Sequence, residues 1–283
     1  MSRMLRLAKA AITLSCAALA PFAIGGPVSA HEFWVSPEAY EVAVGETIEA
    51  SLRNGDMFKG AAYPYIGAFA TRFDVHNRRG TEMIRPRDGD NPALTYDAES
   101  GGLHVVAYDS AMYSLTYASW EKFQAFIDSK PNLAFVYDEH EAKGFPREGI
   151  KEGYYRYPKS LIKVGSGAGR DKPLGRVFEL VAEINPYSEA AKTGVRVQLL
   201  YEGAPFPNTD IQIFHRPGDG TEVAKDHVTT DATGRATIPV FDGGEFLINA
   251  THMRKPRPEA AAQGMHWESI WASLTYELPR IAE

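Results

Sequence analysis

Apolar and polar residues alternate along much of the chain with the two-residue period of half-buried β-strands. Near the start the pattern covers 33–35, 40–44 and 47–52, with turn-forming residues between the runs. It returns near 69–75, 94–96, 102–108, 177–184, 195–200, 210–214, 237–240, 246–250 and 269–278. Short strands at this spacing predict a mainly β protein with two immunoglobulin-like or transthyretin-like β-sandwich domains.

One long segment, about 117–160, departs from this pattern. Residues 119–127 carry apolar side chains at helical spacing behind Ser119, and 137–142 suits a second short helix or turn. Residues 154–160 are aromatic and basic. We interpret the segment as a helical insertion in an N-terminal sandwich of residues 31–170. A stretch rich in Gly and charge then leads to a C-terminal transthyretin-like sandwich of residues 171–283.

The first 30 residues have the features of a secretory signal peptide. Arg3, Arg6 and Lys9 precede an apolar run, and small residues at 28–30 predict cleavage after Ala30. Export predicts a periplasmic protein. The one cysteine of the chain lies inside this segment, so the mature protein is predicted to contain neither a thiol nor a disulfide.

Cleavage after Ala30 would make His31 the first residue of the mature chain. Its α-amine and its imidazole would then offer two nitrogens to one divalent metal ion. Both kinds of group release their protons far more easily than a lysine ammonium, and imidazole is the commonest metal ligand in proteins. The alternative interpretation is that a histidine occupies this position by chance.

The charge balance narrows the range of partners. Removing the signal takes away three of the 30 basic residues and none of the 36 acidic ones, which leaves 27 against 36 and a net charge of −9. An acidic protein of this kind is not expected to bind nucleic acid or an anionic membrane surface. No apolar run after the signal is long enough for a transmembrane helix, so no membrane span is predicted in the mature protein.

Two motifs in the second half resemble a transthyretin-like or carboxypeptidase-regulatory-like sandwich. They are GAPFPNTDI at 203–211 and TDATGRA at 230–236. The glycine of the second motif, Gly234, suits a tight turn with a backbone angle that other residues resist. This resemblance implies a fold rather than an activity, because such modules are commonly passive.

The mature chain as a whole resembles an exported bacterial family of unknown function. The segments that carry the resemblance are HEFW at 31–34, YPKSLIKVG at 157–165, ATH at 250–252 and WASLTY at 271–276. The family is often grouped with periplasmic components of cobalt and nickel uptake. The resemblance therefore implies a metal-handling role and a membrane transporter as a possible partner.

Four of the eight histidines are candidate metal ligands: His31, His252, His104 and His140. None of the eight has H-x-H or H-x-x-x-H spacing, so folding must assemble any site. His252, at the end of strand 246–250, is the preferred partner of His31 in an arrangement that resembles the histidine brace of copper proteins. His104 lies in an alternating run typical of a sheet position, and His140 lies among acids where it could also be solvated. The others are predicted to be surface residues: His76, His215, His227 and His266.

Aromatic residues are numerous for an exported chain with this many polar residues. Most are expected in the core, while some could line a cleft for a chelated metal or a sugar. Arg156 and Lys159 could hold an anionic chelator there, although the sequence favours a solvated role for both. Those aromatics are Phe33, Trp34, Tyr63, Tyr65, Trp120, Tyr154, Tyr155, Tyr157, Trp267 and Trp271.

The sequence favours binding over catalysis. It lacks H-E-x-x-H, G-x-S-x-G and phosphate-loop motifs, and the mature chain has no cysteine nucleophile. The leading hypothesis is a periplasmic protein that binds nickel, cobalt or copper, as an ion or a small chelate, for uptake or homeostasis. A passive β-sandwich scaffold is the alternative, and a copper histidine-brace oxidase is the third hypothesis.

Overall fold

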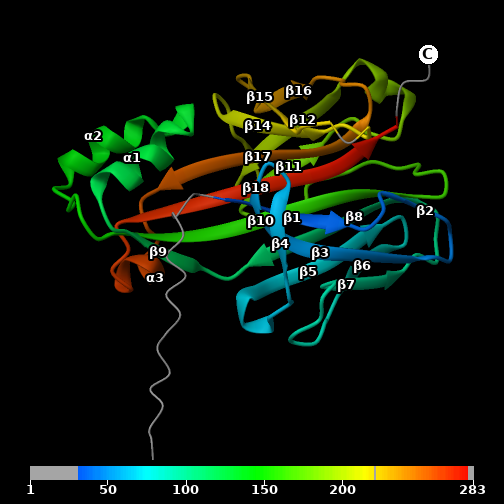
Figure 1. Ribbon diagram of the computed structural model, residues 1–283, viewed down its shortest axis with the longest axis horizontal. Helices are drawn as coiled ribbons and strands as arrows, with labels where there is room; N and C mark the ends of the chain where they lie inside the picture. Colours follow the sequence, from blue (N-terminus) through cyan, green and yellow to red (C-terminus); the bar gives the residue numbers. More distant parts are fainter. Residues whose placement is uncertain (1–30, 220, 280–283) are drawn as a thin grey trace, which may run out of the picture.

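The computed structural model describes residues 31–219 and 221–279, and the described chain is mainly β (Figure 1). The prediction of a β-sandwich fold with a short helical segment is confirmed. The predicted signal peptide, residues 1–30, lies outside the described residues, and so does the predicted cleavage site. None of the helices in the described ranges is long and apolar enough to cross a membrane.

A ten-stranded sheet forms the centre of the molecule. Two of its strands, β10 and β18, pair in parallel and bring residue 156 opposite residue 271. Figure 1 shows β17, β18 and β10 side by side through the middle of the molecule. In spatial order the main path is β15 (Ala224–Thr229), β14 (Asp210–Arg216), β17 (Gly244–Arg254), β18 (Trp267–Leu278), β10 (Ile150–Val164), β8 (Gly102–Ser110), β5 (Ala70–Asn77) and β6 (Gly80–Met83), and β2 (Glu41–Val42) and β9 (Tyr113–Tyr117) also pair with β10.

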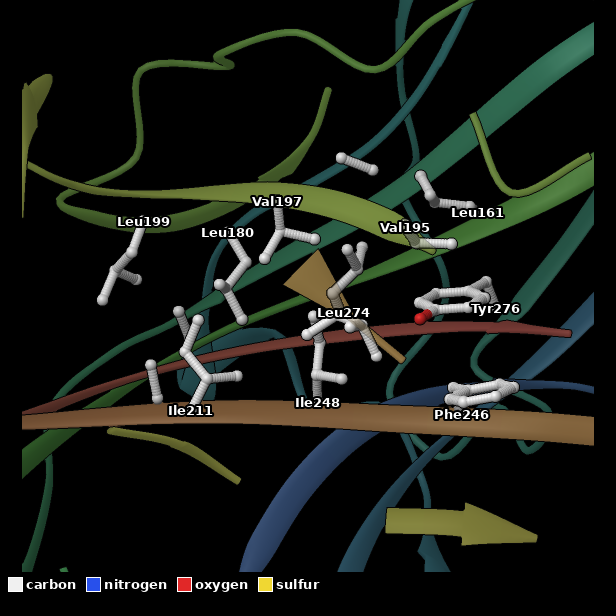
Figure 2. Packing of buried hydrophobic residues seen from close by; sticks show 14 of the residues in the cluster. Leu161, Leu180, Val195, Val197, Leu199, Ile211, Phe246, Ile248, Leu274 and Tyr276 are labelled. Carbon is white, nitrogen blue, oxygen red and sulfur yellow. The ribbon is translucent and has the colours of Figure 1, made fainter. Parts of the chain in front are cut away.

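One face of the central sheet packs against a four-stranded sheet made from the second half of the chain. Side chains alternate along β18, and Ile270, Leu274 and Tyr276 all point to this face. They form the largest hydrophobic core with residues such as Leu180 and Val197 of the covering sheet (Figure 2). The covering strands are β11 (Phe178–Ala182), β12 (Val195–Tyr201), β13 (Ala204–Pro205) and β16 (Arg235–Ile238).

The turn before β16 has the backbone that its sequence predicts. Gly234 adopts a φ of +71°, and a Cβ there would lie 2.8 Å from the carbonyl oxygen of Leu199. Two separate constraints therefore require glycine at this position, the positive backbone angle and the close approach of β12.

The opposite face of the central sheet is covered by a second four-stranded sheet and by helices. Ser273 Oγ donates a hydrogen bond to the carbonyl of Phe33 at 2.6 Å, and Thr275 Oγ1 donates to that of Val35 at 2.8 Å. These two bonds attach the first strand of the chain to β18. The covering strands are β1 (Glu32–Pro37), β3 (Thr47–Asp56), β4 (Lys59–Tyr63) and β7 (Leu94–Asp97).

Helices occupy only part of the predicted insertion. Their apolar faces pack on Met253, Trp267 and Trp271 at one end of the central sheet. The last part of the predicted range belongs to strand β10, which begins at Ile150 and contains the aromatic and basic stretch. The helical elements of the described chain are η1 (Gly67–Phe69), α1 (Trp120–Asp128), η2 (Pro131–Leu133), α2 (Phe135–Ala142), η3 (Glu189–Thr193) and α3 (Pro258–Ala262).

The central sheet and the largest core cross the predicted domain boundary at residues 170 and 171. Leu103 and Leu161 from the first part share one core with Ile213 and Leu274 from the second. The connecting segment is itself anchored by Lys159 of β10, whose Nζ lies 2.8 Å from both carboxylate oxygens of Asp171. The parallel pairing of β10 with β18 thus joins the two predicted sandwiches through one sheet.

Candidate ligand pocket beside His31

His31 directly precedes β1 and lies on the face of the central sheet that carries Trp271. Its carbonyl oxygen accepts a hydrogen bond from Arg156 Nη1 at 2.6 Å. Its Nδ1 is buried and has no hydrogen-bond partner. A buried polar atom without a partner is costly and requires an explanation, because nearly all such atoms in native proteins are paired. This nitrogen is therefore a candidate ligand atom.

A pocket of about 300 Å³ is lined by Phe33 and by Arg156, the residue that binds the His31 carbonyl. It is formed where β1 pairs with β3, which places Phe33 opposite Asn54 on the same face. Since side chains alternate along a strand, His31 is on the same side of β1 as Phe33. The Oδ1 atom of Asn54 is also buried without a partner. The pocket is lined by Phe33, Leu52, Asn54, Tyr63, Pro64, Ile66, Phe69, Tyr108, Tyr113, Tyr154 and Arg156.

Stacked rings form one wall of this pocket. Phe69 stacks on Tyr113 with ring centroids 5.2 Å apart, and Tyr113 stacks on Tyr154 at 5.4 Å. The Arg156 guanidinium continues the column, 5.1 Å from the Tyr154 ring and 4.5 Å from that of Trp271. Burial raises the pKa of both Tyr113 and Tyr154, so their hydroxyls are protonated donors at neutral pH.

Next to His31, but on the opposite side of β1, Glu32 forms a buried polar contact with the helical region. Its Oε1 lies 3.8 Å from Lys130 Nζ, and its Oε2 has no partner. Burial raises the pKa of Glu32 to about 7, against the opposing attraction of Lys130. Burial also lowers the pKa of Lys130 to about 8. Lys130 contacts Gln212 of β14 as well, so this cluster ties β1, the helices and the central sheet together.

The raised pKa of Glu32 predicts a pH-dependent cost to stability. The folded state binds the Glu32 proton more tightly than the unfolded state between the ordinary value of 4.5 and about 7. Stability from this group is therefore present at low pH and lost as the pH rises through that window. Glu32→Gln should remove this pH-dependent loss of stability. Between pH 4.5 and 8, the free energy of unfolding of the variant should therefore rise relative to that of the wild type by on the order of 2–3 kcal/mol. Urea unfolding across this range measures the gain, and parallel pH profiles would contradict the assignment.

The structure does not bring His252 to His31. His252 of β17 pairs with Ile270 of β18 and shares its face, whereas Arg156, which binds His31, pairs with Trp271 on the other face. The His252 ring lies among aromatic side chains, 4.8 Å from Phe206 and 5.6 Å from Tyr201. Burial lowers its pKa to about 4, so the ring is neutral at pH 7.

His104 is on the same face as the pocket but far along the sheet. It pairs with Ile162, which is six residues beyond Arg156 on β10, or about 20 Å. The side chain is buried, and its Nδ1 contacts the carbonyl oxygen of Gly102 at 3.2 Å. This environment supports the interpretation of His104 as a residue packed within the sheet rather than as a metal ligand.

His140 is part of the helical core, and both of its ring nitrogens are used. The indole N–H of Trp267 donates to its Nδ1 at 3.0 Å, so Nε2 carries the proton and donates to the carbonyl of Pro146 at 3.0 Å. The predicted alternative of a solvated residue is wrong, because His140 is 1% exposed. The helix packs this ring against Trp120 and Phe123 instead.

Three other sequence interpretations are corrected by burial. His76 and His215 are buried rather than on the surface, since β5 and β14 are inner strands of the central sheet. Lys159 is 1% exposed and fully engaged by acids, so neither a solvated role nor a chelator role fits it. Arg156 is also buried, but it faces the pocket.

Within residues 31–219 and 221–279, no group of three or more His, Cys, Asp or Glu side chains is arranged to hold a metal ion. His31 and its preferred partner His252 lie on opposite faces of the central sheet, so these two histidines do not form a three-nitrogen brace. Sequence reasoning missed Asn54, Tyr108 and Tyr113 as pocket residues. Their only signal is alternation within strands, which does not tell which strands meet.

Comparisons with known proteins give a family but no activity. None of the curated proteins compared with the chain matches it. A solved structure described as "Crystal structure of tetra-tandem repeat in extending region of large adhesion protein" aligns with 88% of this chain at 12% identity and a TM-score of 0.22, and the match spans 49% of that structure. A TM-score this low carries no argument about fold. Residues 28–254 match the family described as "Domain of unknown function (DUF4198)", and because this is most of the chain, the protein belongs to that family.

Proposed function

We propose that the protein is a periplasmic binding protein for a transition metal ion, nickel, cobalt or copper, carried as a small chelate. The observation that carries the proposal is the unpartnered, buried Nδ1 of His31, a residue whose carbonyl is bound by Arg156 of the pocket wall. Signal cleavage after Ala30 would add the α-amine of the same residue. An amine and an imidazole nitrogen of one histidine form a chelating pair that suits these metals.

The chelate, rather than the bare ion, follows from the number of available ligands. His31 supplies two nitrogens at most, and its three candidate partners lie elsewhere: His252, His104 and His140. Nickel, cobalt and copper fill four or more coordination positions, so the remaining ligands have to come from the bound molecule. The volume of the adjoining pocket, about 300 Å³, is at the lower end of the range for small-molecule sites.

The cellular context is part of the same proposal. A signal peptide at residues 1–30 would deliver the protein to the periplasm, and a membrane transporter would receive the chelate. The second half of the chain, with its transthyretin-like motifs, would serve as the structural support for the first strand. The tight turn at Gly234 and the large shared core support this assignment.

The test compares two forms of the mature protein, one that begins at His31 and one extended by a single Gly. Each is titrated calorimetrically with Ni(II), Co(II) and Cu(II), alone and with an equimolar small chelator such as picolinate. We expect binding by the native form and a loss of at least about 100-fold in the extended form, because the extra residue turns the amine into an amide. Equal binding by both forms, or none by either, would instead favour the passive scaffold.

His252→Ala is the matched histidine control. It removes a half-buried imidazole of the opposite face without touching the pocket beside His31. Its metal binding should equal that of the unaltered protein. A loss as large as that caused by the Gly extension would restore His252 as a ligand and overturn the assignment of the site to His31 alone.

A further inference from the structure

Arg156 is a buried cation without an acidic partner in the described part of the chain. It is 7% exposed, and its one side-chain hydrogen bond is to the carbonyl of His31. Every other buried arginine or lysine of the described chain lies within 4 Å of a carboxylate: Lys130, Lys159 and Arg176. Leaving a buried charge unpaired is costly, so its retention at a pocket wall points to a partner that arrives from outside.

The nearest acids do not neutralise Arg156. Glu32 lies on the opposite side of β1 and is directed toward Lys130, whose Nζ lies 3.8 Å from its Oε1. Burial raises the pKa of Glu152, whose oxygens accept hydrogen bonds from Tyr117 and Ser269. Neither carboxylate forms an ion pair with Arg156 in the described part of the chain, so positive charge remains at the pocket.

Most of the other side chains that line the pocket are aromatic or aliphatic. Three of its residues, Tyr63, Ile66 and Phe69, are large hydrophobic side chains that remain 48%, 39% and 42% exposed. Exposed apolar side chains gathered around one hollow indicate a ligand surface rather than a chance distribution. The stacked column of Phe69, Tyr113 and Tyr154 offers ring faces on which a planar molecule can lie.

We propose that this pocket binds a small planar organic carboxylate, with the carboxylate on Arg156 and the ring against the tyrosine wall. Contacts with the Tyr154 and Trp271 rings and the hydrogen bond to the His31 carbonyl restrict the Arg156 guanidinium, whose fork geometry suits a carboxylate. The inference rests on the proposed function in one respect only: it assigns the organic part of the proposed metal chelate to the class of planar carboxylates. The carboxylate site itself requires neither a metal nor a free amine at His31.

A bare inorganic anion would explain the cation but not the aromatic walls. It would bind Arg156 and leave the apolar surface of Tyr63 and Phe69 exposed to water. A planar carboxylate accounts for both the cation and the aromatic walls. Three probes separate the possibilities: benzoate has both the charge and the ring, its neutral isostere benzamide lacks the charge, and inorganic phosphate lacks the ring.

The experiment titrates metal-free mature protein with these three probes by calorimetry in the presence of EDTA. We expect saturable benzoate binding with a dissociation constant of about 0.1–1 mM, an ordinary value for a ligand of this size. Benzamide and phosphate should each bind at least about 10-fold more weakly, the loss that accompanies removal of one charge-assisted contact. Absence of saturable benzoate binding, or equal binding of benzoate and benzamide, would overturn the proposal.

Two variants and a matched control locate the site. Arg156→Gln should weaken benzoate by at least about 10-fold, and Tyr63→Ala, which alters an exposed side chain, should weaken it about 3-fold. Arg147→Gln is the control, because Arg147 also stacks on a ring, that of Trp120, but is exposed and paired with Glu141. If Arg156→Gln does not fold, Tyr63→Ala and the benzamide comparison still decide the outcome. Unchanged benzoate binding in folded Arg156→Gln would refute the site.

The Gly-extended protein separates this inference from the proposed function. Extension before His31 should abolish metal binding and leave benzoate binding unchanged, since Arg156 and the tyrosines are untouched. Metal binding without benzoate binding would refute the carboxylate site alone. Benzoate binding without metal binding would refute the metal function and keep the carboxylate site.

Discussion

Lys159→Ala is expected to destabilise the fold by about 3–5 kcal/mol, the range found when one partner of a buried ion pair is removed. Lys159 Nζ donates to both oxygens of Asp171 at 2.8 Å, to Glu179 at 3.1 Å and to the carbonyl of Leu180 at 3.1 Å. Without the ammonium, two carboxylates would remain side by side in the interior. Burial already raises the pKa of Asp171 despite the attraction of Lys159, so the variant should gain a proton there on folding.

Urea unfolding at pH 7 measures the effect, and Lys163→Ala is the matched control on the same strand. Lys163 pairs with Glu41 at 2.7 Å near the surface, where an ion pair contributes about 0–1 kcal/mol. The two lysines are four residues apart on β10, yet they should differ several-fold in their cost. Similar losses in both variants would contradict the claim that Lys159 anchors the segment around Asp171.

Trp34→Ala is expected to cost about 3–5 kcal/mol, the usual range for truncating a buried tryptophan. Trp34 is fully buried between β1 and the central sheet, where it contacts Phe58, Phe214 and Leu247. Gly60 of β4 approaches so closely that a Cβ there would lie 2.8 Å from the indole. The substitution would leave a cavity beneath the strand that positions His31, so it should also weaken the metal binding proposed for His31.

Trp34→Phe provides a milder comparison. The indole Nε1 is buried without a hydrogen-bond partner, so phenylalanine removes an unsatisfied donor while it keeps most of the apolar contact. We expect a loss below about 1.5 kcal/mol for this variant. Phe69→Ala, at a half-exposed ring, should also be mild. Thermal unfolding of the three proteins orders the effects, and a Phe69→Ala loss as large as that of Trp34→Ala would contradict the packing described for β1.

Strand positions were predictable because they depend on the alternation of neighbouring residues. The runs at 102–108, 195–200 and 246–250 correspond to β8, β12 and β17. The helix predicted at 119–127 corresponds to α1. The stretch 154–160 was not recognised as a strand, because a buried inner strand with Arg156 and Lys159 lacks the simple alternation of a half-solvated one.

The histidines show where local reasoning ends. His31 and His252 were predicted to be a metal-binding pair, since one follows the predicted signal peptide and the other was expected to end a strand. Their separation was decided by two registers, β10 with β18 and β17 with β18, which put them on opposite faces. A shift of one residue in either register would reverse that result, and no local pattern specifies it.

The sequence by itself determined the mainly β character, the short helical segment, the tight turn at Gly234 and the acidic charge balance of the chain. These properties depend on residues that are neighbours along the chain or on composition. The tertiary structure decided that Arg156 is a buried cation at an aromatic pocket, that Lys159 is an interior anchor and that His140 is a core residue. These outcomes depend on the parallel pairing of β10 with a strand more than a hundred residues away, and on the burial that this pairing imposes.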